Sequence, residues 1–229
     1  MKPPRPDAEG AKRGEPSSPR GPIAGVVLAG GEGRRLGGTK AVLRLPGSQA
    51  GESGPTLVDW AVTRLAAVAA AEEILVAAGN SGTEVDPVDR RVPVLLAGDG
   101  PGSGPAAGVL GAARARPGRN LLVLACDLPL VPMDLLTELA ASNAELAAAA
   151  TDPGDARSMN PTCALWTPRA LQVLATRVER GDYRLYPVTR CADLQVEPVD
   201  AGRFGDPGSV LLNVNTAADW ERARRLVER

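Results

Sequence analysis

The residues best suited to chemistry lie in segment 23–40, where an apolar run breaks into a glycine-rich and basic stretch. The apolar run, Ile23–Ala29, predicts a buried strand. Glycines after a strand, beginning here with Gly30, let backbone N–H groups approach an anion closely, and Arg35 and Lys40 supply positive charge for phosphate. The segment therefore predicts a site that handles a nucleoside triphosphate. A plain turn with solvated basic residues is the alternative interpretation.

Two common phosphate-binding loops do not fit this segment. A Walker A loop has lysine and then serine or threonine directly after its second glycine, whereas Gly38 is followed by Thr39-Lys40, in the reverse order. A dinucleotide-binding fingerprint needs the spacing G-x-G-x-x-G, and Gly31, Gly33 and Gly37 leave one residue too many. A different kind of phosphate site is therefore expected.

A carboxylate follows a second apolar run. Leu121–Ala125 is long enough for a central strand, so Asp127 is expected at its carboxyl end, where Pro129 stops the strand. Mg²⁺ prefers oxygen ligands, often one or two carboxylates together with phosphate oxygens. Asp127 is therefore the predicted magnesium ligand, and an aspartate that only caps the next turn is the alternative. Cys126 is expected to be a small buried apolar residue and not a nucleophile.

Together these segments resemble a known family. The stretch 28–40 resembles the signature L-A-G-G-x-x-x-R-[ML]-G-x-x-K of nucleotidyltransferases, matched by Leu28-Ala29-Gly30-Gly31, Arg35-Leu36-Gly37 and Lys40. Within that superfamily the chain is similar to the molybdenum cofactor guanylyltransferases, whose Cys-Asp-x-Pro motif, here 126–129, binds the metal. The resemblance implies transfer of GMP from GTP to molybdopterin, with Mg²⁺ as cofactor and pyrophosphate as product. Transfer of CMP to molybdopterin, or of a nucleotide to another phosphorylated small molecule, is the alternative.

The resemblance also implies further nucleotide contacts. A Gly-Pro-x-Ala-Gly segment begins at Gly104, and in the family an aspartate before this segment contacts the nucleotide. Asp99 is the candidate here, slightly closer to Gly104 than is common. The family usually has an asparagine at the end of the second strand, where this chain offers Asn80 in a shifted position.

Two asparagines near the C-terminus form another candidate group. Asn213 and Asn215 occupy alternate positions, and therefore one face, of an expected strand end. Thr216 and Asp219 predict a variant capping box that starts a helix, but a helix start does not explain the asparagines. The resembled family has Asn-x-Asn-Thr lining its active site, which implies that the pair binds the acceptor or helps to hold the metal. Asn160-Pro161-Thr162 fits a turn as well as it fits a family segment on the acceptor side.

Composition excludes several kinds of function. The chain has 229 residues, a net charge of -1 and no histidine, which excludes histidine-dependent nucleophilic catalysis and histidine-ligated zinc. The low net charge and the 3% of aromatic residues argue against nucleic acid as a partner and against an acidic membrane surface. Widely spaced cysteines, and no apolar signal core in residues 1–20, fit a reduced, cytoplasmic protein. The resemblance implies molybdoenzymes or their chaperones as protein partners.

The rest of the sequence predicts the scaffold. Residues 1–21 are rich in Pro, Gly, Ser and charge and are expected to form a disordered tail, followed by a single domain over residues 22–229. Strand-like and helix-like runs alternate in that domain, which predicts an α/β fold, a three-layer αβα Rossmann-like sandwich with a mainly parallel sheet. The resemblance implies the nucleotide-diphospho-sugar transferase type of this fold, whose ligands bind beyond the carboxyl ends of the strands. The predicted strands are 23–29, 73–78, 92–96, 121–126, 145–151, 162–166, 194–198 and 210–213. The predicted helices are 56–71, 104–116, 132–142, 168–180 and 217–227.

Overall fold

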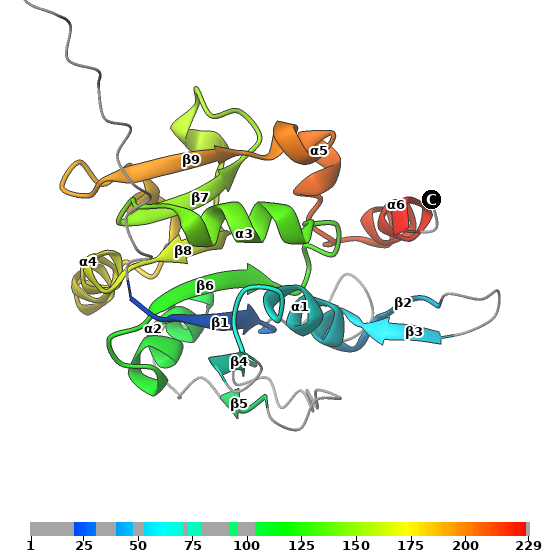
Figure 1. Ribbon diagram of the computed structural model, residues 1–229, viewed down its shortest axis with the longest axis horizontal. Coiled ribbons are helices and arrows are strands. Elements are labelled where there is room, and N and C mark those ends of the chain that lie inside the picture. The colour runs from blue at the N-terminus through cyan, green and yellow to red at the C-terminus, as the bar shows by residue number, and fades with distance from the viewer. Residues whose placement is uncertain are drawn as a thin grey trace, which may run out of the picture.

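The computed structural model describes residues 21–30, 40–47, 53–70, 73–78, 92–95 and 104–227. Gly31, Arg35, Asn80, Asp99 and residues 1–20 of the expected tail lie outside these ranges. The described residues form a large sheet with helices packed on it and a separate two-stranded hairpin (Figure 1).

One seven-stranded sheet organises the fold, with the strand order β5-β4-β1-β6-β8-β7-β9. Its strands are β1 (Ile23–Leu28), β4 (Ile74–Ala77), β5 (Val94–Leu95), β6 (Asn120–Ala125), β7 (Leu146–Ala150), β8 (Met159–Trp166) and β9 (Val196–Asp200). Strand β1 is parallel to β4 and β6, β4 is parallel to β5, and β7 is parallel to β9. Strand β8 runs antiparallel to both of its neighbours, β6 and β7. The predicted α/β fold with a mainly parallel sheet is confirmed.

Strands β1 and β6 form the centre of the sheet. Val26 of β1 lies in register with Val123 of β6, and Leu28 with Ala125. All six residues of β6 are buried, because helices contact the strand and no face of it is left to solvent. This coverage explains why both strands read in the sequence as continuous apolar runs.

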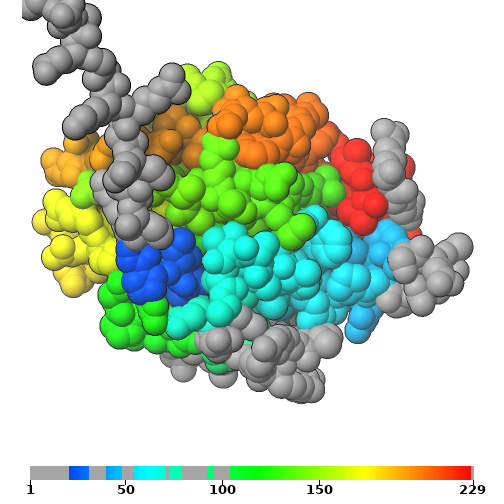
Figure 2. Space-filling view, in the orientation of Figure 1, coloured from blue at the N-terminus to red at the C-terminus, as the bar shows by residue number. Residues whose placement is uncertain are grey.

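Two pairs of helices flank the sheet. Helix α1 (Leu57–Leu65) packs against α3 (Met133–Ala141), and α2 (Pro105–Ala115) packs against α4 (Pro168–Glu179). Helix α1 buries residues 57, 58, 61, 62 and 65, which is the spacing of one apolar helix face. In Figure 2, atoms of α1 (cyan) and α3 (green) cover the middle of the visible face of the sheet. The chain continues through the short α5 (Pro207–Val210) to α6 (Ala217–Val227), and no helix among the described residues is long and apolar enough to cross a membrane.

Strand β7 is alanine-rich, a composition that favours helix by intrinsic propensity. It is a strand nevertheless, because it lies between β8 and β9 in the sheet and all five of its residues have no exposed surface. The sequence alone is compatible with a helix or a strand over this stretch. Pairing with a strand on each side outweighs the helix propensity of alanine, so the segment forms a strand.

Two expectations about secondary structure are wrong or incomplete. The strand expected over 210–213 is wrong, because Pro207–Val210 is helix α5 and residues 211–215 are irregular. Proline suits the first position of that helix. The helix expected over 56–71 ends at Leu65, and turns over 66–68 redirect the chain towards β4 in spite of the alanines there.

Several short elements were not predicted. They are the hairpin strands β2 (Arg44–Pro46) and β3 (Ser53–Thr56) and the 3₁₀ helices η2 (Lys40–Val42), η4 (Ala156–Ser158), η5 (Tyr186–Arg190) and η6 (Ala201–Phe204). Each is too short to leave a periodic pattern in the sequence. Helix η2 begins with Lys40, one of the predicted site residues.

Candidate active site

Asp127 lies directly beyond the carboxyl end of β6, at the edge where the parallel strands of the sheet end. The N–H of Cys126 donates to the carbonyl oxygen of Leu28 at 3.0 Å, so the end of β6 is held to the end of β1. Asp127 is thereby placed next to the end of β1, which Ala29 and Gly30 follow. Its side chain is 21% exposed, so the carboxylate is partly withdrawn from water.

The two carboxylate oxygens of Asp127 differ in their contacts. Oδ2 accepts a hydrogen bond from the ammonium of Lys40 at 3.1 Å. Oδ1 is buried and accepts no hydrogen bond from the residues that the structure describes. A buried polar atom without a partner is uncommon and costs free energy. Oδ1 therefore marks a position where a cation or a donor from a ligand would be favourable.

The pKa of Asp127 supports the same conclusion. Burial raises the pKa of this carboxyl above its usual range, although the charge and the hydrogen bond of Lys40 pull it down. The net upward direction means that burial of the charged form costs more than Lys40 offsets. A second cation beside Oδ1 would offset the remainder, and a divalent ion that prefers oxygen fits this position.

The other ligands of such a cation would have to be neutral oxygens or phosphate. Within the described ranges, no three His, Cys, Asp or Glu side chains gather into a group that could hold a metal ion. Mg²⁺ is commonly held by one or two carboxylates together with substrate phosphates and water. A single carboxylate next to amide oxygens is compatible with that pattern.

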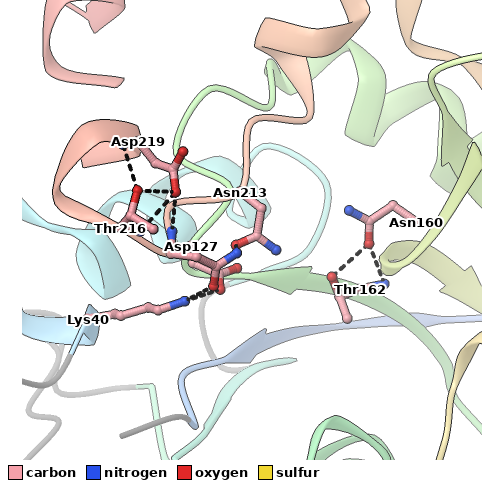
Figure 3. A network of polar contacts seen from close by, with 8 residues as sticks. Lys40, Asp127, Asn160, Thr162, Asn213, Thr216 and Asp219 are labelled. Atoms are coloured by element: carbon pink, nitrogen blue, oxygen red, sulfur yellow. Dashed lines mark hydrogen bonds and ion pairs between the residues drawn. The ribbon is translucent and has the colours of Figure 1, made fainter. Parts of the chain in front are cut away.

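Lys40 joins three segments that are far apart in the sequence. It begins η2, its ammonium bonds to Asp127, and the same ammonium donates to the side-chain oxygen of Asn215 (Figure 3). These two partners lie 87 and 175 residues away from Lys40 along the chain. The Lys40 side chain is 16% exposed, so its charge acts through a partly dry environment, where electrostatic interactions are stronger.

Residues Asn213-Val214-Asn215, called here the asparagine strip, run beside Asp127. The N–H of Val214 donates to the backbone carbonyl oxygen of Asp127 at 2.8 Å. Val214 is fully buried in a small apolar cluster that includes residues of α6, whereas both asparagines are exposed. The side-chain N–H of Asn215 donates to Oδ1 of Asn213 at 2.8 Å. The strip is not a strand end, but its alternation still places the two amides together.

The carboxylate of Asp219, in the first turn of α6, closes one end of this network (Figure 3). Its Oδ2 accepts hydrogen bonds from the N–H and the hydroxyl of Thr216, both at 2.8 Å, and from the N–H of Asn215 at 3.1 Å. The N–H of Asp219 donates back to the Thr216 hydroxyl oxygen at 3.2 Å. The predicted capping box is confirmed. These bonds, the Thr216 hydroxyl first, lower the pKa of Asp219.

Asn160 and Thr162 lie near the start of β8, on the side of Asp127 away from Asp219 in Figure 3. Oδ1 of Asn160 accepts hydrogen bonds from the N–H of Thr162 at 3.0 Å and from its hydroxyl at 2.8 Å. Both bonds are local to the start of β8, where the pairing with β7 shifts register, and they account for Asn160 and Thr162 without a ligand. A contact between this segment and the acceptor stays a prediction.

Comparison with known proteins agrees with this geometry. The sequence profile of the MobA-like NTP transferase domain matches residues 25–196. The chain belongs to the MobA-like NTP transferase family. It is therefore a nucleotidyltransferase, and the molybdenum cofactor guanylyltransferase of Cereibacter sphaeroides is 33% identical to it over 212 residues, which are 90% of this chain and 98% of that protein.

Solved structures share the fold of this transferase. Molybdopterin-guanine dinucleotide biosynthesis protein A from Archaeoglobus fulgidus has a TM-score of 0.66 at 20% identity, covering 89% of this chain and 98% of that one. A Mycobacterium tuberculosis H37Rv protein in complex with manganese has a TM-score of 0.58 at 17% identity, covering 90% and 98%. At these identities the similarity establishes the fold.

Four other described residues that were predicted to contact the nucleotide differ in exposure: two are buried and two are exposed. Leu28 and Ala29 are buried, and the N–H of Ala29 donates to the carbonyl oxygen of Ala77 at 2.9 Å. These two residues are therefore held to the sheet at the end of β1, and their contact with a nucleotide stays a prediction. Gly30 is exposed directly after them, and Gly104 is exposed at the N-cap of α2, where free N–H groups and the helix dipole favour an anion.

Helix α2 approaches the sheet closely at Gly108. A Cβ atom at this position would lie 3.0 Å from Cδ2 of Leu28 and 3.2 Å from Cβ of Ala77. The glycine thus lets the N-terminal half of α2 pack closely against the ends of β1 and β4. The second glycine of the Gly-Pro-x-Ala-Gly segment therefore serves packing.

Two features of the site escaped sequence analysis. The indole N–H of Trp60, in α1, donates to the carbonyl oxygen of Pro129 at 2.7 Å and so holds the segment that follows Asp127. No motif signals this bond, because a tryptophan on a helix face looks like an ordinary packing residue. The second feature is the bond from the Asn215 N–H to Asp219, which the capping pattern hints at but does not require.

Cys126 is a buried residue, as the sequence predicted. All three cysteines of the chain are free thiols, and Cys126 is buried. Burial raises the pKa of the Cys126 thiol, which disfavours the nucleophilic thiolate. Cys126 is thus a packing residue beside Asp127.

Proposed function

We propose that the protein transfers GMP from GTP to molybdopterin, forming the guanine dinucleotide cofactor and pyrophosphate, with Mg²⁺ held at Asp127. The observation that carries the proposal is the buried, unpartnered Oδ1 of Asp127 beside the ammonium of Lys40, in a chain of the MobA-like family. The name of the Cereibacter sphaeroides relative supports guanine as the base and the molybdenum cofactor as the acceptor.

The acceptor in this proposal is a phosphate monoester, which explains why the site needs no general base. A phosphate monoester has a second pKa near ~6 and is largely a dianion at neutral pH. Its oxygen can attack the α-phosphorus of GTP without giving up a proton. The absence of histidine from the sequence is compatible with such a reaction.

The difficulty of the reaction is the repulsion between two anionic phosphates. Lys40 offsets part of that charge, and Arg35 and the backbone N–H groups at Gly30 and Gly104 contribute in the same sense. Mg²⁺, when bound to Asp127, supplies further positive charge and orients the phosphate oxygens. The amides of the asparagine strip orient the acceptor or complete the metal site. Positioning and electrostatics carry most of phosphoryl transfer, so this small set of groups suffices.

Differential stabilisation by nucleotides tests the base. The melting temperature is measured with Mg²⁺ and equal concentrations of GTP, CTP, ATP or UTP. A nucleotide at about 100 times its dissociation constant stabilises the folded protein by roughly 2.7 kcal/mol, and one that does not bind stabilises it by almost nothing. The expected result is a clearly larger shift with GTP, because a site that hydrogen-bonds one base leaves polar groups unpaired with another.

Product analysis tests the reaction itself. Incubation with GTP, Mg²⁺ and molybdopterin is expected to yield the guanine dinucleotide and pyrophosphate. The matched control is Asp127→Asn, which keeps the shape of the side chain and removes the charge that holds the metal. A larger shift and product with CTP would replace the proposal by a cytidylyltransferase, and equal shifts with all four nucleotides would show that only phosphates are recognised.

The cellular setting forms the last part of the proposal. Free thiols persist in reducing compartments, so the three free cysteines support a cytoplasmic location. Molybdoenzymes or their chaperones would then receive the dinucleotide product. Pull-down of these proteins with the transferase is the direct measurement.

A further inference from the structure

The carboxylate of Asp219 makes one bond that helix capping does not require. A capping box consists of the two reciprocal bonds between Thr216 and Asp219, and both are present. Oδ2 of Asp219 also accepts the N–H of Asn215 at 3.1 Å, one residue before the cap. Asn215 is the residue whose side chain bonds to the ammonium of Lys40.

We propose that Asp219 is a positioning residue for nucleotide transfer, which holds Asn215 so that Asn215 orients the ammonium of Lys40 beside Asp127. This inference rests on the proposed function. Within the described residues Asp219 makes no hydrogen bond or ion pair with Lys40 or Asp127; its partners are Thr216 and Asn215. Its effect therefore passes through the asparagine strip.

The asparagine strip has two anchors. The N–H of Val214 is held by the carbonyl oxygen of Asp127 at 2.8 Å, and the N–H of Asn215 is held by Asp219. With both anchors, the Asn215 amide donates to Asn213 and accepts from Lys40 at the same time. Without Asp219, the peptide after Val214 is free to rotate, and Lys40 loses a fixed acceptor.

The charge of Asp219 acts in the same direction. The hydrogen bonds from Thr216 and Asn215 are the main causes that lower the pKa of Asp219, and the charge of Lys40 adds a small contribution in the same direction. The ammonium of Lys40 itself is held by Asp127 and by Asn215, the residue that Asp219 anchors. Small displacements of an oriented group reduce the rate of a transfer reaction strongly.

Three variants separate these contributions. Asp219→Ala removes every acceptor, Asp219→Asn keeps one amide oxygen without the charge, and Asp219→Glu keeps the charge with a side chain that also suits a capping box. The readout is the single-turnover rate of GMP transfer at saturating GTP and Mg²⁺, at a temperature where each variant is folded. The expected loss is about tenfold to a hundredfold for Asp219→Ala, with an intermediate loss for Asp219→Asn and substantial recovery for Asp219→Glu.

A double-mutant cycle with Asn215 decides whether Asp219 acts through this residue. In the Asn215→Ala background, Asp219→Ala is expected to change the rate by less than about twofold, because residues that act as one unit are not additive. Thr167→Val is the matched control, since it removes the N-cap hydroxyl of α4. Thr167 follows Trp166, which pairs with Leu121 near the start of β6, whereas Asp127 follows the end of that strand. This control is expected to lower the melting temperature and to leave the rate unchanged.

The outcomes are distinct. A rate for Asp219→Ala equal to that of wild type, or additive losses in the cycle, would overturn the role of Asp219 and leave it as a helix cap. Absence of GMP transfer by the wild-type protein would instead refute the proposed function. In that case the same cycle is measured on Mn²⁺ and GTP binding, which needs no turnover, and non-additive losses of affinity there would still support Asp219 as a positioning residue, whereas additive losses would overturn it.

Discussion

Replacing Lys40 with methionine is expected to destabilise the ligand-free protein by about 2–4 kcal/mol at pH 7, because it leaves a buried carboxylate without its cation. Methionine keeps most of the length of the side chain and removes the charge. In the wild-type protein the ammonium lies 3.1 Å from Oδ2 of Asp127, and the two side chains are 16% and 21% exposed. The variant therefore measures what this partly buried ion pair contributes.

The geometry sets the size of the effect. At 3.1 Å and an effective dielectric constant of about 20, two unit charges attract each other by about 5 kcal/mol. The variant avoids part of this loss by protonating Asp127. A carboxyl with an unperturbed pKa of about 3.9 costs about 4 kcal/mol to protonate at pH 7, since each pH unit is worth about 1.4 kcal/mol. Protonation thus limits the destabilisation to about 4 kcal/mol.

The pH dependence has a definite sign. Lys40 pulls the pKa of Asp127 down, so the folded variant binds the proton at Asp127 more tightly than the folded wild-type protein does. Lowering the pH therefore stabilises the variant more than the wild type. At pH 5, protonation costs only about 1.5 kcal/mol, and the difference between the two proteins narrows accordingly. Urea denaturation at pH 7, 6 and 5 measures the free energy of unfolding of both proteins without adding salt.

Two further measurements complete this test. The double variant Lys40→Met/Asp127→Asn is expected to recover most of the stability, because a neutral pair carries no buried charge. Mn²⁺, measured by electron paramagnetic resonance without nucleotide, is expected to bind Lys40→Met more tightly than wild type, because both oxygens of Asp127 are then available. A Lys40→Met protein as stable as wild type, or a loss of stability that is the same at all three pH values, would refute the description of Asp127 as a buried, charged partner of Lys40.

The remaining predictions concern turnover, packing and the N-terminus. Asp127→Ala is expected to slow single-turnover GMP transfer by about 10²–10³ while the melting curve stays cooperative, and a rate within about tenfold of wild type would reject Asp127 as the metal ligand. Gly108→Ala gains up to about 1 kcal/mol of helix propensity, but the added methyl group meets Cδ2 of Leu28 and Cβ of Ala77 at 3.0 and 3.2 Å. Because Ala77 lies in a strand that cannot shift freely, we expect a net loss of stability of about 1 kcal/mol, and a variant more stable than wild type in urea denaturation would contradict this. Deletion of residues 1–21 is expected to leave the melting temperature and the turnover unchanged, because their composition cannot bury apolar surface, and aggregation or inactivity of the shortened protein would contradict this.

Much of the scaffold could be predicted because its strands are buried on both faces. The runs at 23–29 and 121–126 are continuous and apolar, and in the structure they become the paired strands β1 and β6. Parallel strands end at one edge, so the position of Asp127 after β6 followed directly from the pattern. The antiparallel direction of β8 did not follow, because nothing in the residues of one strand states the direction of its neighbour.

The asparagine strip shows where sequence reasoning reached the correct arrangement through the wrong element. Alternation predicted that Asn213 and Asn215 share one face, and they do, although residues 211–215 are irregular. The alternation comes from Val214, which is fully buried between them. A strand and an extended irregular segment have the same period of two, so the side-chain pattern does not distinguish them.

The candidate site is recognisable in the structure mainly because it departs from the pairing of buried polar atoms that holds for most of the described chain. Oδ1 of Asp127 is one of very few buried side-chain oxygens or nitrogens there without a hydrogen bond. A sequence selected for stability alone would place asparagine or an apolar residue at the end of β6, because burial already raises the pKa of the carboxyl despite Lys40. Keeping a carboxylate there lowers the stability of the ligand-free protein, and under the proposed function that cost is offset when a cation and anionic phosphates bind together. Lys40 is the counter-ion of Asp127 in the ligand-free protein, and its bonds to Asp127 and Asn215 hold three distant segments together. The proposed function predicts that this is the arrangement those ligands require.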